Sequence, residues 1–370
     1  MLIKPEVEKF VRIKVIGVGG GGSNTIKTMM EEQNIAGVEF ITVNTDAQDL
    51  AISPAPNKIQ IGKELTKGLG AGGNPEVGRE SAEESVDEIE KHLEGTNMVF
   101  ITAGMGGGTG SGAAPFIAEI AKKKGALTVG VVTKPFSFEG ARRMANAEKA
   151  LDEMRDKVDA LITIPNQRLL EIMDENRPLL DAFKVADSVL GQSVQGISDI
   201  IVLPGLINRD FADVKSIMSE AGSALMGIGY GSGEDRAVKA AQEAINSPLL
   251  ENSIDGAKGI LFNVVGGIDL TLSEVNKAAE VISAAADPDA NIIFGAAVNE
   301  EQKDTIKITV IATGFDSPRS KDRVNIHARI RQQAVMQPTV GSTIVRPQVT
   351  EVTKDNSDDE YDTPAFLRRH

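Results

Sequence analysis

The sequence predicts an α/β fold whose first half is a doubly wound, mostly parallel sheet. Short apolar runs alternate with loops and helical patterns over residues 11–165, which is the order of a parallel sheet with crossover helices. In addition, three of the loops that follow these runs are rich in glycine. We also expect a central long helix, a second, smaller α/β domain and a disordered C-terminal tail.

Composition narrows the class of protein. The chain has 370 residues and is 41% hydrophobic, so it can bury the cores of two domains. Its net charge of −14 argues against nucleic-acid binding. It has no cysteine and three widely separated histidines, so we expect neither thiolate chemistry nor a metal cluster. No apolar run approaches the roughly 18 residues of a membrane span and no signal peptide is evident, which favours a cytoplasmic protein without direct membrane insertion.

The first strand is expected at residues 11–16. It leads into the glycine-rich loop 17–24 and then a helix that begins at Thr25. A G-x-G-x-x-G pattern after a strand is typical of dinucleotide binding, and Asp46, after the next strand at 38–43, could bind a ribose. A dinucleotide-dependent oxidoreductase is therefore one candidate.

The segment 65–75 is also rich in glycine and follows a short strand at 59–61. Alone it would be interpreted as a mobile loop. Together with the other glycine-rich loops it is better explained as part of a shared phosphate site, because ligands gather at the carboxyl ends of parallel strands. An amphipathic helix is expected over residues 82–93.

The loop 104–112 carries the strongest signal, with six glycines in nine residues. It follows a buried strand at 98–101 and precedes a helix with Pro115 in its first turn. Such a loop points backbone N–H groups at a phosphate, and the helix N-terminus adds a favourable partial charge. Thr109 and Ser111 are expected as hydroxyl donors. A tight turn is the plainer alternative.

Polar side chains follow the next two strands. Glu139 and Arg143, after a strand at 126–133, could bind ribose and phosphate, or could form an exposed ion pair. Asn166, after a strand at 160–164, could read a purine edge or cap a helix. The residues alone leave these alternatives open.

The long helix is expected at about 178–196, with a strand at 200–203 after it. Asp187 in this helix could accept from a purine N–H or could be a surface acid. Asp210 and Asp213 suit a helix N-cap and first turn, or a carboxylate pair that orients water. Inside a phosphate pocket, such a pair would repel the ligand.

The second domain is expected to alternate helices with strands. The helices fall near 211–226, 234–246 and 273–286, and the strands at 260–265, 292–298 and 306–312. From residue 316 polar residues and proline replace the apolar periodicity. The expected boundaries are 1–177 for the nucleotide domain, 178–204 for the central helix and strand, 205–315 for the second domain, 316–358 for a disordered linker and 359–370 for a docking peptide.

Several motifs together resemble the tubulin/FtsZ family of GTPases. They are Gly17–Gly22, Asn44–Gln48, Gly68–Gly72, Gly106–Gly112 and Asn208–Asp213. The resemblance covers about residues 10–315 and the terminal peptide. It implies a GTPase that uses GTP and Mg²⁺, polymerises head to tail into protofilaments with copies of itself, and forms the division ring at midcell.

The resemblance also implies roles for single residues. Phe183 would stack on guanine, while Asn166 and Asp187 would hold its polar edge. The implied nucleotide-binding residues are Gly20, Gly21, Gly22, Ser23, Asn24, Asn44, Ala71, Gly72, Gly107, Gly108, Thr109, Gly110, Glu139, Arg143, Asn166, Phe183 and Asp187.

Asp210 and Asp213, with Asn208, would act on the nucleotide of the neighbouring subunit, which removes the difficulty of repulsion. A non-hydrolysing, nucleotide-gated scaffold, in which Asp210 and Asp213 are only helix caps, is the remaining alternative.

Near the C-terminus the resemblance implies a peptide that binds membrane-adaptor division proteins. Its implied contact residues are Asp362, Pro364, Phe366, Leu367 and Arg368. Ser111 and Thr363 depart from the family's usual residues, a threonine and an aliphatic residue.

Overall fold

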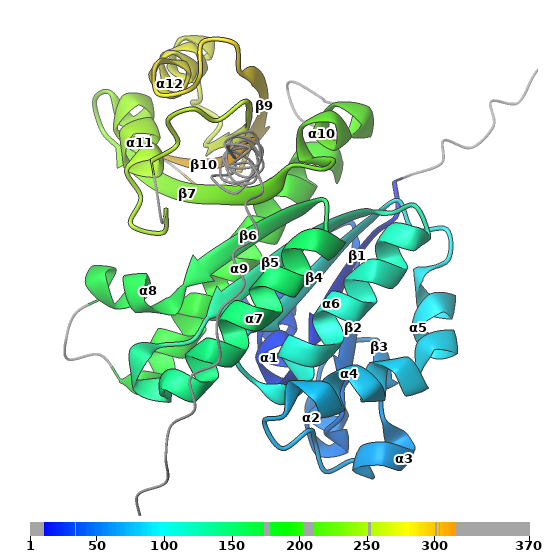
Figure 1. The fold of residues 1–370 in the computed structure, drawn as a ribbon. Helices are drawn as coiled ribbons and strands as arrows, with labels where there is room; N and C mark the ends of the chain where they lie inside the picture. The colour runs from blue at the N-terminus through cyan, green and yellow to red at the C-terminus, as the bar shows by residue number, and fades with distance from the viewer. Residues whose placement is uncertain are drawn as a thin grey trace, which may run out of the picture. The chain divides into compact units, whose positions relative to one another are not determined.

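The computed structural model describes residues 11–33, 35–173, 178–202, 210–250, 253–299, 302 and 304–315. Its strands form a ten-stranded sheet in the order β3-β2-β1-β4-β5-β6-β7-β10-β8-β9 (Figure 1). The expectation of an α/β fold built on a mostly parallel sheet is confirmed.

The strands of the first half are parallel to one another. They are β1 (Ile13–Val18), β2 (Val38–Asn44), β3 (Asn57–Gln60), β4 (Met98–Gly104), β5 (Leu127–Lys134) and β6 (Ala160–Pro165). Because they run in one direction, their carboxyl ends lie at one edge of the sheet, and the loops that follow them meet there.

Helices cover both faces of this parallel part (Figure 1). One face carries α1 (Gly19–Glu31) and α9 (Leu179–Val202), and the other carries α4 (Pro75–Glu84), α5 (Val86–Leu93), α6 (Gly108–Lys123) and α7 (Ala141–Lys157). Successive strand residues alternate between the two cores, as with Val15 and Ile16. The strands therefore read as continuous apolar runs because both faces are buried.

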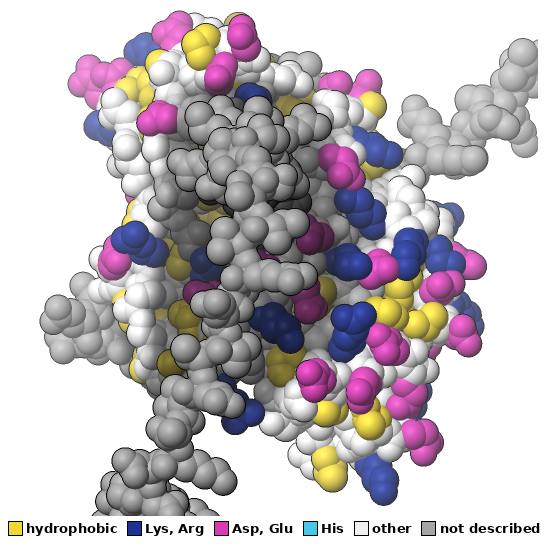
Figure 2. All heavy atoms as spheres, viewed as in Figure 1, with side chains coloured by type: hydrophobic (Ala, Val, Ile, Leu, Met, Phe, Trp, Pro, Cys, Tyr) yellow, Lys and Arg dark blue, Asp and Glu magenta, His cyan; other side chains and the backbone are white. Residues whose placement is uncertain are grey.

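Shorter elements complete the carboxyl edge. They are α2 (Ala47–Ile52), α3 (Lys63–Thr66), the 3₁₀ turn η1 (Ser137–Glu139) and α8 (Asn166–Ile172). On the face that carries α4, α6 and α7, acidic and basic side chains are interspersed (Figure 2). Such mixed charge is typical of a solvated surface.

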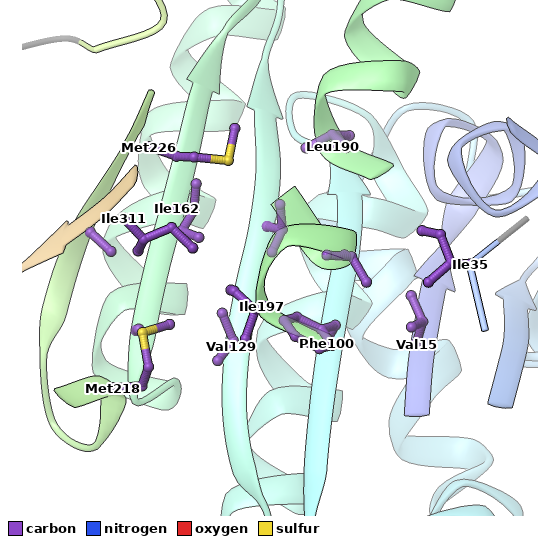
Figure 3. Close-up of a cluster of buried hydrophobic side chains, with 14 of the residues drawn as sticks. Val15, Ile35, Phe100, Val129, Ile162, Leu190, Ile197, Met218, Met226 and Ile311 are labelled. Carbon is purple, nitrogen blue, oxygen red and sulfur yellow. The ribbon is translucent and has the colours of Figure 1, made fainter. Parts of the chain in front are cut away.

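Helix α9 packs along the sheet and joins the two halves. Figure 3 shows Ile197 of α9 beside Val129 and Phe100 of the parallel strands. The same buried cluster continues to Met226 and Ile311 in the second half. The core therefore runs across both halves beneath a single helix.

The second half extends the sheet with β7 (Gly222–Ser232), β10 (Thr305–Thr313), β8 (Gly259–Gly266) and β9 (Asn291–Val298). Its helices are α10 (Phe211–Met218), α11 (Arg236–Ile245) and α12 (Leu272–Ala284). Strand β10 is antiparallel to both neighbours, and β7 pairs with β6 over only three residue pairs. The two halves thus share a narrow β connection.

The helix expected over 211–226 is wrong beyond Met218, because residues 222–232 form strand β7. Glycine occupies positions 227, 229 and 231, which face α11. A Cβ at any of them would meet a backbone atom of that helix. Because α11 packs so closely, these inward positions carry glycine instead of apolar side chains, and the alternation that normally indicates a strand is missing from the sequence.

Three further expectations differ from the structure. The strand expected at 200–203 is wrong over 200–202, which belong to α9, because Ile200 packs into the core below that helix. Helix α6 begins at Gly108, so Pro115 lies inside the helix rather than in its first turn. The single helix expected over 82–93 is divided at Ser85 into α4 and α5.

Candidate nucleotide-binding site

Two adjoining cavities lie at the carboxyl edge of the parallel strands. The first, of about 110 Å³, is lined by the first turns of α1, by β4 and β5 and by α9. The second, of about 480 Å³, is lined by the glycine-rich segments around residues 72 and 107 and by α7. Glu139 and Arg143 line both. The site therefore has a narrow end beside α9 and a wide end between the glycine loops.

Two helix N-termini lie at this edge: that of α6 lines the wide cavity, and the first turns of α1 line the narrow one. Helix α1 begins at Gly19 and α6 at Gly108, and within the described residues neither start receives a side-chain capping hydrogen bond or has an acid in its first turn. Their first N–H groups lack intrahelical acceptors, and their partial positive charges favour an anion. The glycine loops therefore offer an anion site, and phosphate binding by them stays a prediction.

The hydroxyl groups near these loops have different partners. Thr109 Oγ1 lies 2.7 Å from Thr45 Oγ1, where either can donate. Ser111 Oγ instead accepts from the Gly106 N–H at 2.8 Å. The Ser111 hydroxyl is buried and its oxygen fixes the loop that precedes α6, while its proton stays free to donate, so donation to phosphate stays a prediction.

The loop after β2 is also held internally. Asn44 Nδ2 donates to Asp49 Oδ2 at 2.6 Å, and its Oδ1 accepts from the Thr45 N–H at 2.9 Å. Asp46 caps α2 by accepting from the backbone N–H groups of Gln48 and Asp49. The carboxylate that a dinucleotide-binding interpretation assigned to a ribose is therefore engaged as a helix cap.

Several residues predicted to bind the nucleotide are buried and do not line either cavity. Gly22 packs against Gly17 and Thr102, and buried Ser23 Oγ has no hydrogen-bond partner within the described chain. Gly20 is exposed, whereas Gly21 and Asn24 line the narrow cavity. Gly72, Gly107 and Gly108 line the wide one, Ala71 and Gly110 are buried beside it, and direct contact of each with a ligand stays a prediction.

Asn166 lies at the narrow end with only 5% of its surface exposed. The N-cap of α8 is Pro165, so Asn166 does not cap that helix. Its Oδ1 is buried without a hydrogen-bond partner among the described residues. Since buried polar atoms are normally satisfied, this oxygen points to a ligand with a donor group.

Asp187 projects from α9 into the same cavity. Its Oδ1 accepts from the Thr25 hydroxyl at 2.7 Å. Burial raises the pKa of Asp187 to about 6, the Thr25 hydrogen bond opposes this rise, and the charge of Glu32 adds to it. Asp187 is therefore a partly buried acceptor that lines the cavity, and not a freely exposed surface acid.

Phe183 closes the narrow end from one turn earlier on α9. Its ring contacts Phe136 edge to face, with centroids 5.3 Å apart, and Phe138 at 6.5 Å. Phe183 is still 38% exposed. A fixed aromatic ring with a free surface beside two polar groups suits a planar heterocycle.

Glu139 and Arg143 form an ion pair, with Oε2 and Nη1 separated by 3.1 Å. The Glu139 side chain is only 10% exposed and its Oε1 accepts from the Phe136 N–H at 2.9 Å. The expected ion pair therefore exists, but it lies within the site, between its narrow and wide ends.

Asp210 and Asp213 lie elsewhere. Asp210 occupies the N-cap of α10, but in the described chain its side chain makes no capping hydrogen bond; Asp213 lies in the first turn. After α10, the Gly222 N–H donates at 2.9 Å to the carbonyl of Asp159, the residue before β6. Helix α10 is thus joined to the amino edge of the sheet, opposite α2 and α3 in Figure 1.

Some predicted residues lie outside the described part of the chain. These are Asn208 and the tail residues Asp362, Pro364, Phe366, Leu367 and Arg368. Thr25, Met105, Thr133 and Leu190 line the narrow cavity but were not predicted from sequence. Of these four, only Thr25 could have been predicted from sequence to line the site, because it lies one helical turn after Gly21 of the glycine-rich loop.

Comparison with known proteins identifies the family. Residues 12–174 match the GTPase domain of the tubulin/FtsZ family, and residues 222–316 match the C-terminal domain of the FtsZ family. An FtsZ dimer from M. jannaschii and a mutant of that FtsZ are each 48% identical, with a TM-score of 0.80. The matches cover 83% of this chain, and 89% and 92% of those chains.

CetZ2 from Haloferax volcanii, solved as a GTPγS-bound protofilament, shares the fold at 19% identity and a TM-score of 0.71, over 88% of this chain and 99% of that one. The class that the fold and site define is thus a nucleotide-binding protein with a tubulin-like architecture. The chain belongs to the tubulin/FtsZ family and is a GTPase. A dinucleotide-dependent oxidoreductase is thereby excluded.

Proposed function

We propose that the protein polymerises head to tail into protofilaments and hydrolyses GTP at the junction between subunits. One subunit holds the nucleotide, and the next supplies Asp210 and Asp213, together with Asn208. The observation that carries this proposal is the position of α10 at the sheet edge opposite the glycine loops.

The distance between the edges makes an intramolecular role for these acids difficult. Strand β5 has eight residues, so it spans roughly 26 Å from one edge to the other. A carboxylate side chain cannot cross that gap. Stacking subunits head to tail brings the α10 edge of one against the nucleotide edge of the next, which completes the site.

The chemistry suits two half-sites. The starts of α1 and α6 bind the phosphates through N–H groups, whereas acids held permanently beside them would repel the ligand. Carboxylates that arrive with the neighbour can accept hydrogen bonds from a water molecule and orient it toward the γ-phosphate. In phosphoryl transfer, such positioning and charge stabilisation supply most of the rate enhancement.

Mg²⁺ fits this site as a phosphate-bound ion. The described residues contain no group of three or more His, Asp or Glu side chains that could hold a metal. Mg²⁺ commonly keeps several waters and binds substrate phosphates with few protein ligands. When bound, it would offset charge on the phosphate oxygens.

Guanine is the base that the narrow end favours. Guanine presents adjacent N–H donors from its ring and its amino group, which suits the acceptor pair of an Asp187 carboxylate. Asn166 has a free oxygen for a further donor, and Phe183 offers a stacking surface. Adenine lacks this pair of adjacent donors.

We further propose that the filaments form the cell-division ring in the cytoplasm at midcell, with residues 359–370 binding membrane-adaptor proteins. Membership of the FtsZ family and 48% identity to FtsZ support this role. In the part of the chain that the structure describes, no helix is long and apolar enough to cross a membrane.

Subunit mixing tests the shared site. Asp213→Ala should bind GTP normally but lose most turnover, while Asp187→Asn should bind GTP poorly but still present intact acids. Mixed together, the two should recover turnover, because a GTP-loaded Asp213→Ala subunit can meet the acids of an Asp187→Asn neighbour. Asp156→Ala, which alters an exposed acid of α7, is the control.

Mixtures that stay as inactive as the separate variants, while still co-assembling, would contradict the shared site. Normal turnover by Asp213→Ala alone would also contradict it and would favour a role for the acid as a first-turn helix residue. Filaments without phosphate release in the unaltered protein would favour a scaffold gated by nucleotide binding.

A further inference from the structure

Thr25 connects the narrow, base-binding end of the site to the glycine turn at the phosphate end. It lies on α1 without exposed surface and lines the cavity beside Asp187. Its Oγ1 is 2.7 Å from Asp187 Oδ1 and 3.0 Å from the carbonyl oxygen of Gly21. One hydroxyl thus contacts both the acceptor for the base and the first turn of α1.

A threonine hydroxyl has a single proton, so it donates to one of these oxygens at a time. The Asp187 oxygen is the nearer acceptor, and an ionised carboxylate is the stronger one. The hydroxyl therefore donates to Asp187 while that side chain is charged. If Asp187 is protonated, the hydroxyl is released to the Gly21 carbonyl, the contact typical of threonine inside a helix.

The hydrogen bond restricts a rotation that is otherwise soft. The terminal torsion of an aspartate has broad minima, so burial alone does not fix the plane of the carboxylate. Fixing Oδ1 from α1 holds that plane relative to the cavity. Accepting two adjacent N–H groups at once depends on this orientation more than accepting one does.

We propose that Thr25 is a positioning residue for base specificity, whose hydroxyl holds Asp187 in the orientation that accepts both N–H groups of guanine. The proposal rests on the guanine-binding role given to Asp187 under the proposed function. It adds a residue that acts on the base through Asp187.

The charges around Asp187 support this role. Burial raises the pKa of Asp187, the Thr25 hydrogen bond lowers it, and Glu32 on α1 raises it. The Glu139–Arg143 pair lines the same cavity, and Lys184 lies one turn away on α9. Removing the hydroxyl therefore raises the pKa of Asp187 further and leaves less of the ionised acceptor near neutral pH.

The test is equilibrium binding of GDP and IDP to the full-length protein by isothermal titration calorimetry, since diphosphates avoid turnover. IDP lacks the 2-amino group and so offers one N–H donor where GDP offers two adjacent groups. Thr25→Val keeps the shape and removes the hydroxyl, whereas Thr25→Ser keeps the hydroxyl. Thr28→Val is the matched control, a buried threonine of the same helix that is absent from the cavity lining.

We expect Thr25→Val to weaken GDP binding about tenfold, the size of a lost hydrogen bond to a charged group. IDP binding should weaken less, so the preference for GDP narrows. The pH below which GDP affinity falls should move upward. Thr25→Ser and Thr28→Val should keep the preference and the pH profile; if Thr25→Val does not fold, Thr25→Ala takes its place.

Equal weakening of GDP and IDP with an unchanged pH profile would show that Thr25 only packs, and would overturn the proposal. Asp187→Asn separates a failure of the guanine-binding role of Asp187 from a failure of the positioning role of Thr25. If it keeps the preference for GDP, the base-binding role of Asp187 fails. If it removes the preference while Thr25→Val retains it, only the inference about Thr25 fails.

Discussion

At the residue scale, Asp187 shows how a partly buried acid costs stability. The carboxylate lines a cavity from α9, and desolvation there raises its pKa from 3.8 to about 6. The folded, ligand-free protein therefore binds a proton more tightly than the unfolded chain does. A nucleotide that donates to the carboxylate would offset this penalty, which links binding at this residue to stability.

The first prediction concerns pH. Because the folded pKa of Asp187 is raised, ionising this carboxylate lowers the free energy of unfolding. The loss is absent below about pH 4, grows between pH 4 and 6, and reaches roughly 2 to 3 kcal/mol above that range. Asp187→Asn should lack this loss. Urea unfolding of ligand-free protein at pH 4.5 and 8 checks it, and the same difference in both proteins would contradict it.

Asp199 provides the control for that prediction. Burial also raises its pKa to about 6, with Lys307 opposing the rise, yet Asp199 does not line the cavity. Asp199→Asn should therefore change the pH dependence of unfolding in the same direction while leaving GDP affinity unchanged. Asp187→Asn should change both.

The second prediction compares Gly107, which precedes α6, with Gly112, which lies inside that helix. A Cβ at Gly112 would meet the backbone of α4, including the Arg79 nitrogen at 2.6 Å, whereas a Cβ at Gly107 meets nothing within 4 Å. Gly112→Ala should lower stability by about 2 kcal/mol or more through overpacking. Gly107→Ala should fold normally but bind GDP less tightly, because its methyl group enters the wide cavity.

Thermal unfolding and GDP titration of the two variants check this comparison. Equal stability of Gly112→Ala and the unaltered protein would mean that α4 and α6 can separate without cost.

The sequence indicated which kinds of residue build the site, but not which of their polar atoms lack a hydrogen-bond partner within the fold. Asn166 and Asp187 could be proposed because amides and carboxylates read purines, and the structure distinguishes them from a cap and a surface acid. The hydrogen-bond partners of Ser111 and Thr25 could not be predicted, because a hydroxyl donates or accepts according to neighbours brought close only by folding.

At the scale of elements, α11 and α12 are joined by a nearly buried guanidinium. Arg236 on α11 is 7% exposed; its Nη1 lies 2.5 Å from Asp269 Oδ2 and its Nε lies 2.7 Å from Glu274 Oε1. Arg236 and the capping box with Thr271 lower the pKa of Glu274 to about 2. This network holds α11 over the glycines of β7.

The third prediction tests this network. Arg236→Met should destabilise the protein by about 2 kcal/mol, because two carboxylates lose their cation. The depressed pKa of Glu274 stabilises the fold above its ordinary 4.5, and that contribution is lost as pH falls toward 2. The variant should lack this part of the acid dependence in denaturant unfolding.

Lys277→Met is the matched control. Its ion pair with Asp235 joins side chains that are 51% and 57% exposed, so its loss should cost less than about 1 kcal/mol. If Arg236→Met and Lys277→Met lose the same free energy of unfolding, burial does not make the Arg236 network more stabilising than an exposed ion pair.

Elements were predictable wherever their own side chains carry the apolar pattern. The parallel strands were found as continuous apolar runs, and α12 because its buried residues follow the helical period. Strand β7 was missed because its packing uses the absence of side chains, and the end of α9 was misassigned because short apolar runs suit either element.

At the scale of the whole molecule, the sheet separates the two groups of predicted site residues. Asp159 anchors the turn after α10 to the amino edge of β6, with its carbonyl bound by the Gly222 N–H and its Oδ2 by the Thr128 N–H. The glycine loops lie at the carboxyl edge. Sequence motifs indicated both groups of residues, but only the sheet topology places them at opposite ends.

The fourth prediction follows from this separation. Since neither edge alone holds both the nucleotide and the acids, hydrolysis should require contact between subunits. Turnover should therefore depend on protein concentration in parallel with assembly, and Asp213→Ala should lose most turnover while still binding GTP.

The most direct test is GTP turnover per subunit over a wide range of protein concentration, with light scattering recorded on the same samples. The shared-site account predicts turnover near zero below a threshold and a rise together with scattering above it. Turnover per subunit that stays constant across concentrations would mean that each chain hydrolyses GTP alone, and would contradict the role given to Asp210 and Asp213.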